Sequence, residues 1–185
     1  EEIFIPFTVG GGIRSVEDAR QILRLGADKV SLNTAAVMRP DLISEIANEF
    51  GNQCVVVAID ARRSDATSCG FEVFTHGGRE RTGLSLLKWA YEAVEKGAGE
   101  ILLTSMDRDG TKDGFDIEML KAVGKKISVP LIASGGAGSS TDMVNGALLG
   151  DADALLAASI FHFGELTVSD VRKELLKAGL TVRGA

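Results

Sequence analysis

The stretch IPFTVGGGIRSVEDARQILRLG, residues 5–26, contains the unit that decides the fold. An apolar run leads into Gly10-Gly11-Gly12, and a segment whose apolar residues recur at helical spacing follows and ends at Gly26. Ser15 stands where the helix would begin, and its hydroxyl is suited to cap the first turn. A glycine after the last turn can adopt the left-handed conformation that closes a helix. The stretch therefore predicts a strand, a glycine-rich loop and a helix, in that order.

Units of this kind recur along the whole chain. The predicted strands are almost continuously apolar, as is typical of parallel strands covered on both faces; they are Ile5–Val9, Lys29–Leu32, Val55–Ile59, Ile101–Ser105, Leu131–Ala133 and Ala154–Ala158. A segment of helical periodicity follows each of them. Strands alternating with helices predict an α/β fold with right-handed crossovers. Periodicity leaves two architectures open, namely an open doubly wound sheet and a closed eight-stranded barrel.

Residues 64–83 interrupt this order. Phe71, Val73 and Thr75 alternate with polar residues there, and glycines stand before and after them. This pattern is typical of antiparallel strands, so we predict a small hairpin inserted between the third strand and its helix.

The first and last parts of the chain are similar in sequence. At a constant separation of 125 residues the same residue type occurs in six pairs, which are Gly10/Gly135, Gly11/Gly136, Ser15/Ser140, Leu23/Leu148, Ala27/Ala152 and Asp28/Asp153. These pairs fall on the glycine loop, the helix and the start of the next strand. The sequence therefore predicts a two-fold repeat within the fold.

Length and composition predict one globular domain over residues 1–185. The chain has 45% hydrophobic and 25% charged residues, which are ordinary values for a folded protein. Its net charge of −6, without a run of lysine or arginine, argues against nucleic acids and membrane surfaces as partners. No apolar run approaches the ~20 residues that span a bilayer. Because two cysteines make no disulfide framework, we expect a soluble cytoplasmic protein.

Both glycine loops are candidate phosphate sites. Gly11 and Gly12 precede one predicted helix, and Gly135 and Gly136 precede another. Glycines let backbone N–H groups approach an anion, and the N-terminus of a helix adds partial positive charge. A tight turn without a ligand is the alternative for either loop taken alone.

Short polar residues follow the next strands at the same separation. Asn33-Thr34 and Ala158-Ser159 stand 125 residues apart, and residues of this kind are suited to complete each phosphate site. Helix capping is the alternative interpretation. Matched positions in both halves favour phosphate binding at two sites.

Two carboxylates are candidates for acid–base chemistry. Asp60 ends the most apolar strand of the chain, where a charge is costly to bury unless it has a function. Asp109 follows another predicted strand and would lie at the same end of the sheet. A salt bridge from Asp60 to Arg62 or Arg63 is the alternative. The chain's two histidines are not at metal-ligand spacing, so we expect neither a catalytic metal nor a cofactor.

Six segments of the chain, taken together, resemble one family. They are Val9–Arg14, Asp28–Ala36, Val56–Ala61, Thr104–Gly110, Ala133–Gly138 and Ala157–Phe163. In this order, and over essentially the whole chain, they resemble the cyclase subunit of imidazole glycerol phosphate synthase, an enzyme of histidine biosynthesis.

The resemblance implies a fold and a reaction. The family fold is a (βα)8 TIM barrel of two similar half-barrels, and this chain resembles units three to eight, an incomplete barrel without the first two. The family's enzyme receives ammonia from a glutaminase subunit, with which it forms a heterodimer. It converts ammonia and a substrate with two phosphates, phosphoribulosyl-formimino-aminoimidazole carboxamide ribonucleotide, to imidazole glycerol phosphate and aminoimidazole carboxamide ribonucleotide.

The resemblance also assigns residues. It implies that Asp60 is a catalytic aspartate. One phosphate site would include Gly12, Asn33 and Thr34, and the opposite site would include Asp109, Gly110, Gly135, Gly136, Ala158 and Ser159. Lys29 and Glu100 match charged residues where ammonia enters from the partner, and Asp28 would meet that partner.

Two other functions are weighed against the cyclase. One is the isomerase of the same pathway, whose substrate also has two phosphates, and the other is a non-catalytic fragment that docks the glutaminase. The segments Ile59–Arg62, Phe74–Gly78 and Phe161–Phe163 favour the cyclase. Because the family's second catalytic aspartate lies on the first strand, we expect the isolated chain to be inactive. We also expect it to form dimers or larger aggregates through two exposed strand edges.

Overall fold

Six parallel strands run side by side through residues 5–183, the part of the chain that the computed structural model describes. Their order in the sheet is β1-β2-β3-β6-β7-β8. Their bounds are β1 Thr8–Gly10, β2 Lys29–Leu32, β3 Val55–Arg63, β6 Glu100–Ser105, β7 Leu131–Ser134 and β8 Ala154–Leu155. The predicted domain of residues 1–185 also includes 1–4, 184 and 185, which lie outside the described residues.

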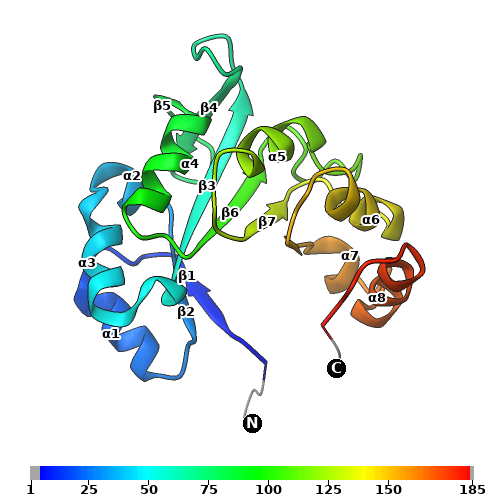
Figure 1. Ribbon diagram of the computed structural model, residues 1–185, viewed down its shortest axis with the longest axis horizontal. Helices are drawn as coiled ribbons and strands as arrows, with labels where there is room; N and C mark the ends of the chain where they lie inside the picture. The colour runs from blue at the N-terminus through cyan, green and yellow to red at the C-terminus, as the bar shows by residue number, and fades with distance from the viewer. Residues whose placement is uncertain (1–4, 184–185) are drawn as a thin grey trace.

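Helices connect the strands and cover one side of the sheet. They are α1 Val16–Arg24, α2 Thr34–Met38, α3 Asp41–Phe50, α4 Leu86–Glu95, α5 Ile117–Gly124, α6 Ser140–Leu148, α7 Ser159–His162 and α8 Val168–Lys177, with a 3₁₀ turn at Asn52–Cys54. Figure 1 shows the strands as an arc with the long helices on its outer side. A doubly wound sheet would have helices on both faces. The predicted α/β fold is therefore confirmed as an incomplete TIM barrel.

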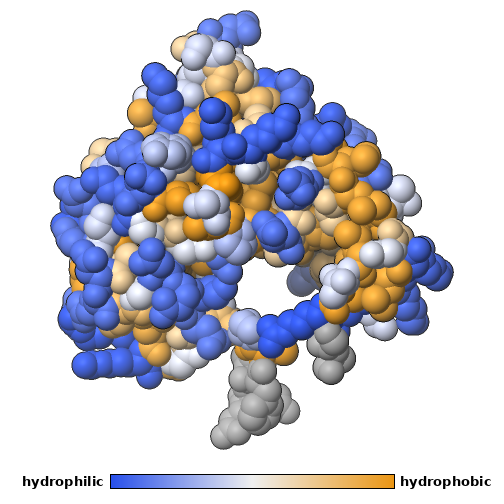
Figure 2. Space-filling model, in the orientation of Figure 1, coloured by the Kyte–Doolittle hydropathy of each residue, from blue (hydrophilic) through white to orange (hydrophobic). Residues whose placement is uncertain are grey.

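The two faces of the sheet differ in burial. On β6, Ile101, Leu103 and Ser105 are buried, whereas the alternate residues Leu102 and Thr104 are half-exposed. Since successive side chains of a strand point to opposite faces, one face packs beneath the helices and the other faces the inside of the arc. Figure 2 shows the molecule hollowed at the centre of this arc.

The two outer strands are shorter or shifted relative to the prediction. β1 begins at Thr8 rather than Ile5, and β8 ends at Leu155 rather than Ala158. Each pairs with one neighbour within the described residues, so only one side of the strand is held by a ladder of hydrogen bonds. Ile5 is 73% exposed and Leu156 is 41% exposed at these edges. Association of the chain through the edges stays a prediction.

The hairpin consists of β4 Phe71–Thr75 and β5 Glu80–Ser85, and it extends two residues past the predicted 64–83. β4 pairs with the end of β3. The buried Glu72 carboxylate fastens the hairpin, because it accepts hydrogen bonds from Arg81 (2.7 Å), from the Ser64 hydroxyl (2.8 Å) and from the Gly83 N–H (3.0 Å). These bonds, that of Arg81 foremost, lower the pKa of Glu72 to about 2.

The structure supports the two-fold repeat but changes the separation in sequence between matching residues. The separation is 124 residues over the glycine loops, because Gly11 and Gly12 share positive φ angles with Gly135 and Gly136. It is also 124 over the helices, where Ser15 caps α1 and Ser139, not Ser140, caps α6. The separation becomes 125 at β2 and β8 because the loop after α6 is one residue longer.

Helices in the described range are short. The longest of them have ten residues, and no helix within residues 5–183 is long and apolar enough to cross a bilayer.

Candidate active site

The predicted site residues follow the carboxyl ends of the parallel strands. Gly11 follows β1, Asn33 follows β2, and Asp60 lies near the end of β3. Asp109 follows β6, and the second set of glycines follows β7. Because parallel strands all end on the same side of the sheet, these residues share one end of the arc, where TIM barrels place their chemistry.

Asp60 is half-buried and is held by an amide. The Asn33 Nδ2 donates a hydrogen bond of 3.0 Å to Asp60 Oδ2. Burial raises the pKa of Asp60, the bond from Asn33 lowers it, and the negative charge of Asp109 raises it; the net shift is upward. A carboxyl group with a raised pKa is suited to exchange protons near neutral pH.

No arginine neutralises Asp60 within the described residues. Arg63 pairs instead with Asp116 at 3.1 Å and Glu118 at 2.9 Å. The Arg62 guanidinium lies 5.2 Å from the centre of the Phe74 ring. The alternative interpretation, a salt bridge from Asp60 to either arginine, is therefore wrong.

The first glycine loop lines a cavity of about 750 Å³. Gly11 (φ 96°) and Gly12 (φ 78°) have the left-handed conformation that favours glycine, and a Cβ at either position would meet nothing within 4 Å. The cavity is also lined by Asn33 and by the exposed cations Arg14 and Arg39. Arg39 pairs with Glu45 at 3.1 Å, whereas Arg14 is in no ion pair with a described residue. Open backbone next to a helix N-terminus and the Arg14 cation fit a phosphate group.

The second glycine loop lines a smaller cavity of about 170 Å³ with Asp109, Gly110, Ala158 and Ser159. Its glycines are buried against other backbone. A Cβ on Gly135 would lie 2.6 Å from the Ser105 carbonyl oxygen, and one on Gly136 would lie 2.2 Å from the Gly114 carbonyl oxygen. Lys112 at its rim pairs with Glu165 at 2.6 Å.

The hairpin turn adds a residue to the first cavity that sequence reasoning missed. His76 lines this cavity, and its backbone N–H donates a hydrogen bond of 3.0 Å to Thr34 Oγ1. Thr34 is thus fixed by the hairpin, and Asn33, the N-cap residue of α2, makes no capping bond with its side chain. Arg14 and Arg39 were missed too, although a basic residue directly after a glycine loop was a usable signal for Arg14.

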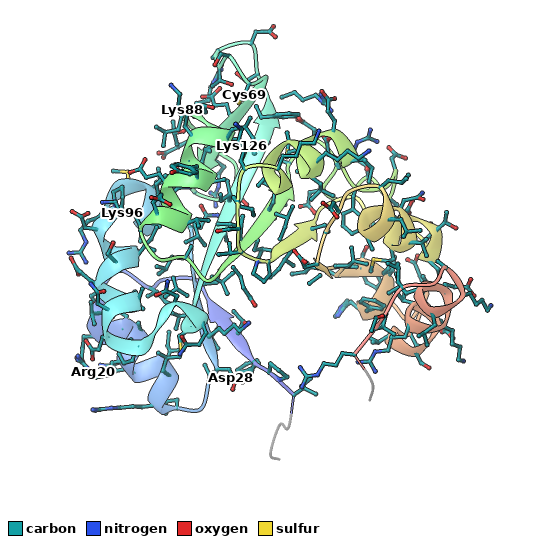
Figure 3. The ribbon with its side chains drawn as sticks, viewed as in Figure 1. Arg20, Asp28, Cys69, Lys88, Lys96 and Lys126 are labelled. Carbon is teal, nitrogen blue, oxygen red and sulfur yellow. The ribbon has the colours of Figure 1, made fainter. Side chains whose placement is uncertain are left out.

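The residues predicted to lie where ammonia enters are at the opposite end of the strands. Lys29 starts β2, Glu100 starts β6, and their side chains form an ion pair across β3. Asp28 accepts a hydrogen bond of 2.7 Å from the Phe7 N–H, so it holds the start of the first strand to the second. Figure 3 shows Asp28 at this end of the molecule.

A metal site is absent from residues 5–183, in the sense that no three His, Cys, Asp or Glu side chains are grouped to hold an ion. What the site offers is a half-buried carboxyl group with a raised pKa, on a strand between two glycine-loop cavities. With the curved parallel sheet, this arrangement defines the class: a TIM-barrel protein with its site at the carboxyl ends of the strands.

Comparison with known proteins gives the particular family. Residues 1–167 match the family described as "Histidine biosynthesis protein". The chain is 58% identical over 186 residues to "Imidazole glycerol phosphate synthase subunit HisF" of Thermobifida fusca (strain YX), and 58% identical over 183 residues to the protein of the same name from Streptomyces coelicolor. Each alignment covers 99% of this chain and 72% of the relative.

The chain belongs to the histidine biosynthesis protein family, as a cyclase subunit of imidazole glycerol phosphate synthase. Its function is the cyclase step of histidine biosynthesis, a lyase reaction, and it is a subunit of a complex. The isomerase and the non-catalytic fragment are not favoured. Each relative is longer than the part that this chain matches, and the absence of two units before Glu1 stays a prediction.

Proposed function

We propose that Asp60 exchanges the proton during ring closure by the cyclase, with one substrate phosphate on each side of it. One observation carries this proposal. The strand order β1-β2-β3-β6-β7-β8 puts Asp60, on β3, between the cavity at the ends of β1 and β2 and the cavity at the ends of β7 and β8. A substrate with a phosphate at both ends would then present its middle to the carboxyl group.

Each cavity binds a phosphate with different groups. In the first, the open N–H groups of Gly11 and Gly12 approach the anion, and Arg14 adds positive charge. In the second, the backbone of Gly110, Gly135 and Gly136 and the Ser159 hydroxyl surround it, next to Ala158. The substrate is phosphoribulosyl-formimino-aminoimidazole carboxamide ribonucleotide.

Asp60 and Asp109 have different roles in the reaction. Asn33 orients the Asp60 carboxyl group, which gives and takes a proton as ammonia is incorporated into the imidazole ring. Asp109 is exposed and contributes negative charge that holds the proton on Asp60. Imidazole glycerol phosphate and aminoimidazole carboxamide ribonucleotide are the products.

The partner subunit is a glutaminase that supplies ammonia in the cytoplasm. The Lys29–Glu100 ion pair, at the end of the sheet opposite Asp60, marks the point where ammonia enters, and Asp28 lies beside it. An ammonia path along the inside of the arc would connect the two ends of the strands. No cofactor takes part.

The experiment that tests the proposal is the substitution Asp60→Asn in the full natural protein, assayed with ammonium salts in place of the glutaminase. We expect turnover to fall by about 10²–10⁴-fold, while the dissociation constant of the substrate changes little, because the phosphates bind elsewhere. Wild-type turnover would remove Asp60 from the mechanism. Titration with inorganic phosphate tests the sites, since Gly12→Val should weaken its binding.

A further inference from the structure

The second glycine-loop cavity is lined by one cation. Of the described residues that line it, Asp109 and Lys112 are the charged ones, and both are exposed. The negative charge of Asp109 repels a phosphate, so the Lys112 ammonium is the group in the lining that offsets this repulsion. The neighbouring Arg108 does not line the cavity, and its guanidinium donates a hydrogen bond of 3.4 Å to the Asp113 carbonyl. Lys112 is thus the lining residue whose charge attracts a phosphate.

The backbone fixes the position of Lys112 beside this cavity. Its φ angle is 62°, a left-handed conformation that residues with a side chain rarely adopt. A Cβ on Gly138 would lie 2.6 Å from the Lys112 carbonyl oxygen, so the close approach of the two loops requires glycine there. The Gly114 N–H also donates a hydrogen bond of 2.8 Å to the Gly136 carbonyl. An uncommon conformation that is held by its surroundings in this way is typical of functional sites.

The Lys112 ammonium already has an anionic partner. Its Nζ donates to both carboxylate oxygens of Glu165, at 2.6 Å and 2.8 Å. Glu165 lies between α7 and α8 and lines a neighbouring cavity, not the second glycine-loop cavity. The two side chains are 43% and 42% exposed, and water screens an ion pair of this kind, so the pair is weak. A phosphate monoester carries more negative charge than a carboxylate and therefore competes well for Lys112.

We propose that Lys112 is a phosphate-binding residue of the cyclase, and that it exchanges Glu165 for a substrate phosphate when the substrate binds. This inference rests on the proposed function, in which the second cavity holds one of the two substrate phosphates. In the free protein, Glu165 keeps the ammonium beside the cavity without occupying the cavity itself. When the phosphate enters, the Lys112 side chain turns to the phosphate oxygens, and the Glu165 carboxylate is left to water. Lys112 therefore strengthens phosphate binding, whereas Glu165 weakens it by competing for Lys112.

The experiment uses inorganic phosphate as the probe and amide resonances to separate the two cavities. The full natural protein, isotopically labelled, is titrated with phosphate while its amide NMR spectra are recorded. The amides of Gly135 and Gly136 report on the second cavity, and those of Gly11 and Gly12 report on the first. Lys112→Gln should raise the dissociation constant at the second cavity about three- to tenfold and leave the first unchanged. Lys112→Arg keeps the positive charge and should restore binding.

Glu165 variants distinguish an exchange of partners from simple repulsion. Glu165→Gln frees Lys112 and should lower the dissociation constant at the second cavity about two- to fivefold. If Glu165 acted only by repelling phosphate through space, this gain would persist in the absence of Lys112. We expect instead that the double variant Lys112→Gln/Glu165→Gln binds phosphate as Lys112→Gln does. Lys173→Gln is the matched control, because Lys173 lines the same cavity as Glu165 and not the second glycine-loop cavity, and it should change neither site.

Turnover with ammonium salts extends the test to the substrate. Lys112→Gln should raise KM several-fold and leave kcat nearly unchanged, because Lys112 contacts a phosphate and not the reacting atoms. If phosphate leaves the Gly135 and Gly136 amides of the wild type unmoved, the second phosphate site itself is overturned, and this inference with it. If these amides respond in the wild type but Lys112→Gln and Glu165→Gln bind phosphate equally well, the site stands and the role of Lys112 is overturned.

Discussion

The two glycine-loop units, β1–α1–β2 and β7–α6–β8, are built alike and packed differently. In both, a serine caps the helix, through Ser15 and Ser139. In both, an aspartate accepts the N–H at the start of the preceding strand, Asp28 from Phe7 and Asp153 from Leu131. The local hydrogen bonds are therefore the same in both halves of the repeat.

The neighbours of the two loops differ. The second loop has the β6–α5 loop packed against it, so Gly135 and Gly136 are buried and the cavity beside them is small. The first loop follows β1, which has no neighbour on its outer side within residues 5–183, so its glycines are exposed and its cavity is large. One local structure thus yields an open cavity and a closed one, depending on what packs beside it.

The largest test of this comparison is to add a methyl group to each loop. Gly136→Ala should lower the free energy of unfolding by about 3 kcal/mol or more, because the new Cβ overlaps the Gly114 carbonyl and the φ angle is positive. Gly12→Ala should cost only about 1 kcal/mol, from its φ angle alone. Urea denaturation of both variants measures the difference, and equal losses would show that the two loops are packed alike.

A smaller difference in stability is expected when the two aspartates that accept an N–H at the start of a strand, Asp28 and Asp153, are replaced. Asp153→Ala should cost about 1–3 kcal/mol, because Leu131 is 1% exposed and its N–H would be left buried without an acceptor. Asp28→Ala should cost less than about 0.5 kcal/mol, because Phe7 is 46% exposed and water can reach its N–H. Thermal unfolding of both variants measures these losses of stability. A larger loss for Asp28→Ala than for Asp153→Ala would contradict this account.

The smallest expected effect concerns Asn33, whose counterpart in the repeat is Ala158. Asn33→Ala removes the hydrogen bond that lowers the pKa of Asp60, so burial and Asp109 are left to raise it further. The limb of the pH–rate profile that belongs to Asp60 should move to higher pH. Ser159→Ala is the control, since no hydrogen bond links it to Asp60, and this limb should stay in place. An unmoved limb in Asn33→Ala would show that Asn33 does not tune Asp60.

Local patterns in the sequence determined the strand–loop–helix unit and the order in which such units follow one another. Apolar runs followed by glycine and helical periodicity predicted the parallel strands and helices, and Asp60 stood out as a charge at the end of an apolar strand. Such features depend on the conformations open to a few neighbouring residues, which is why they can be predicted from one chain. The family resemblance joined them into a barrel of the cyclase type.

Only the tertiary structure decided the contacts between distant segments. It moved the repeat to a separation of 124 residues over the loops, since one extra residue after α6 is absorbed where the chain turns. It brought Asn33 to Asp60, His76 to Thr34, and Cys69 to Ser85, the N-cap residue of α4. Each of these pairs joins residues at least 16 positions apart, and their meeting depends on how the strands pair and the hairpin folds back, which no local pattern encodes.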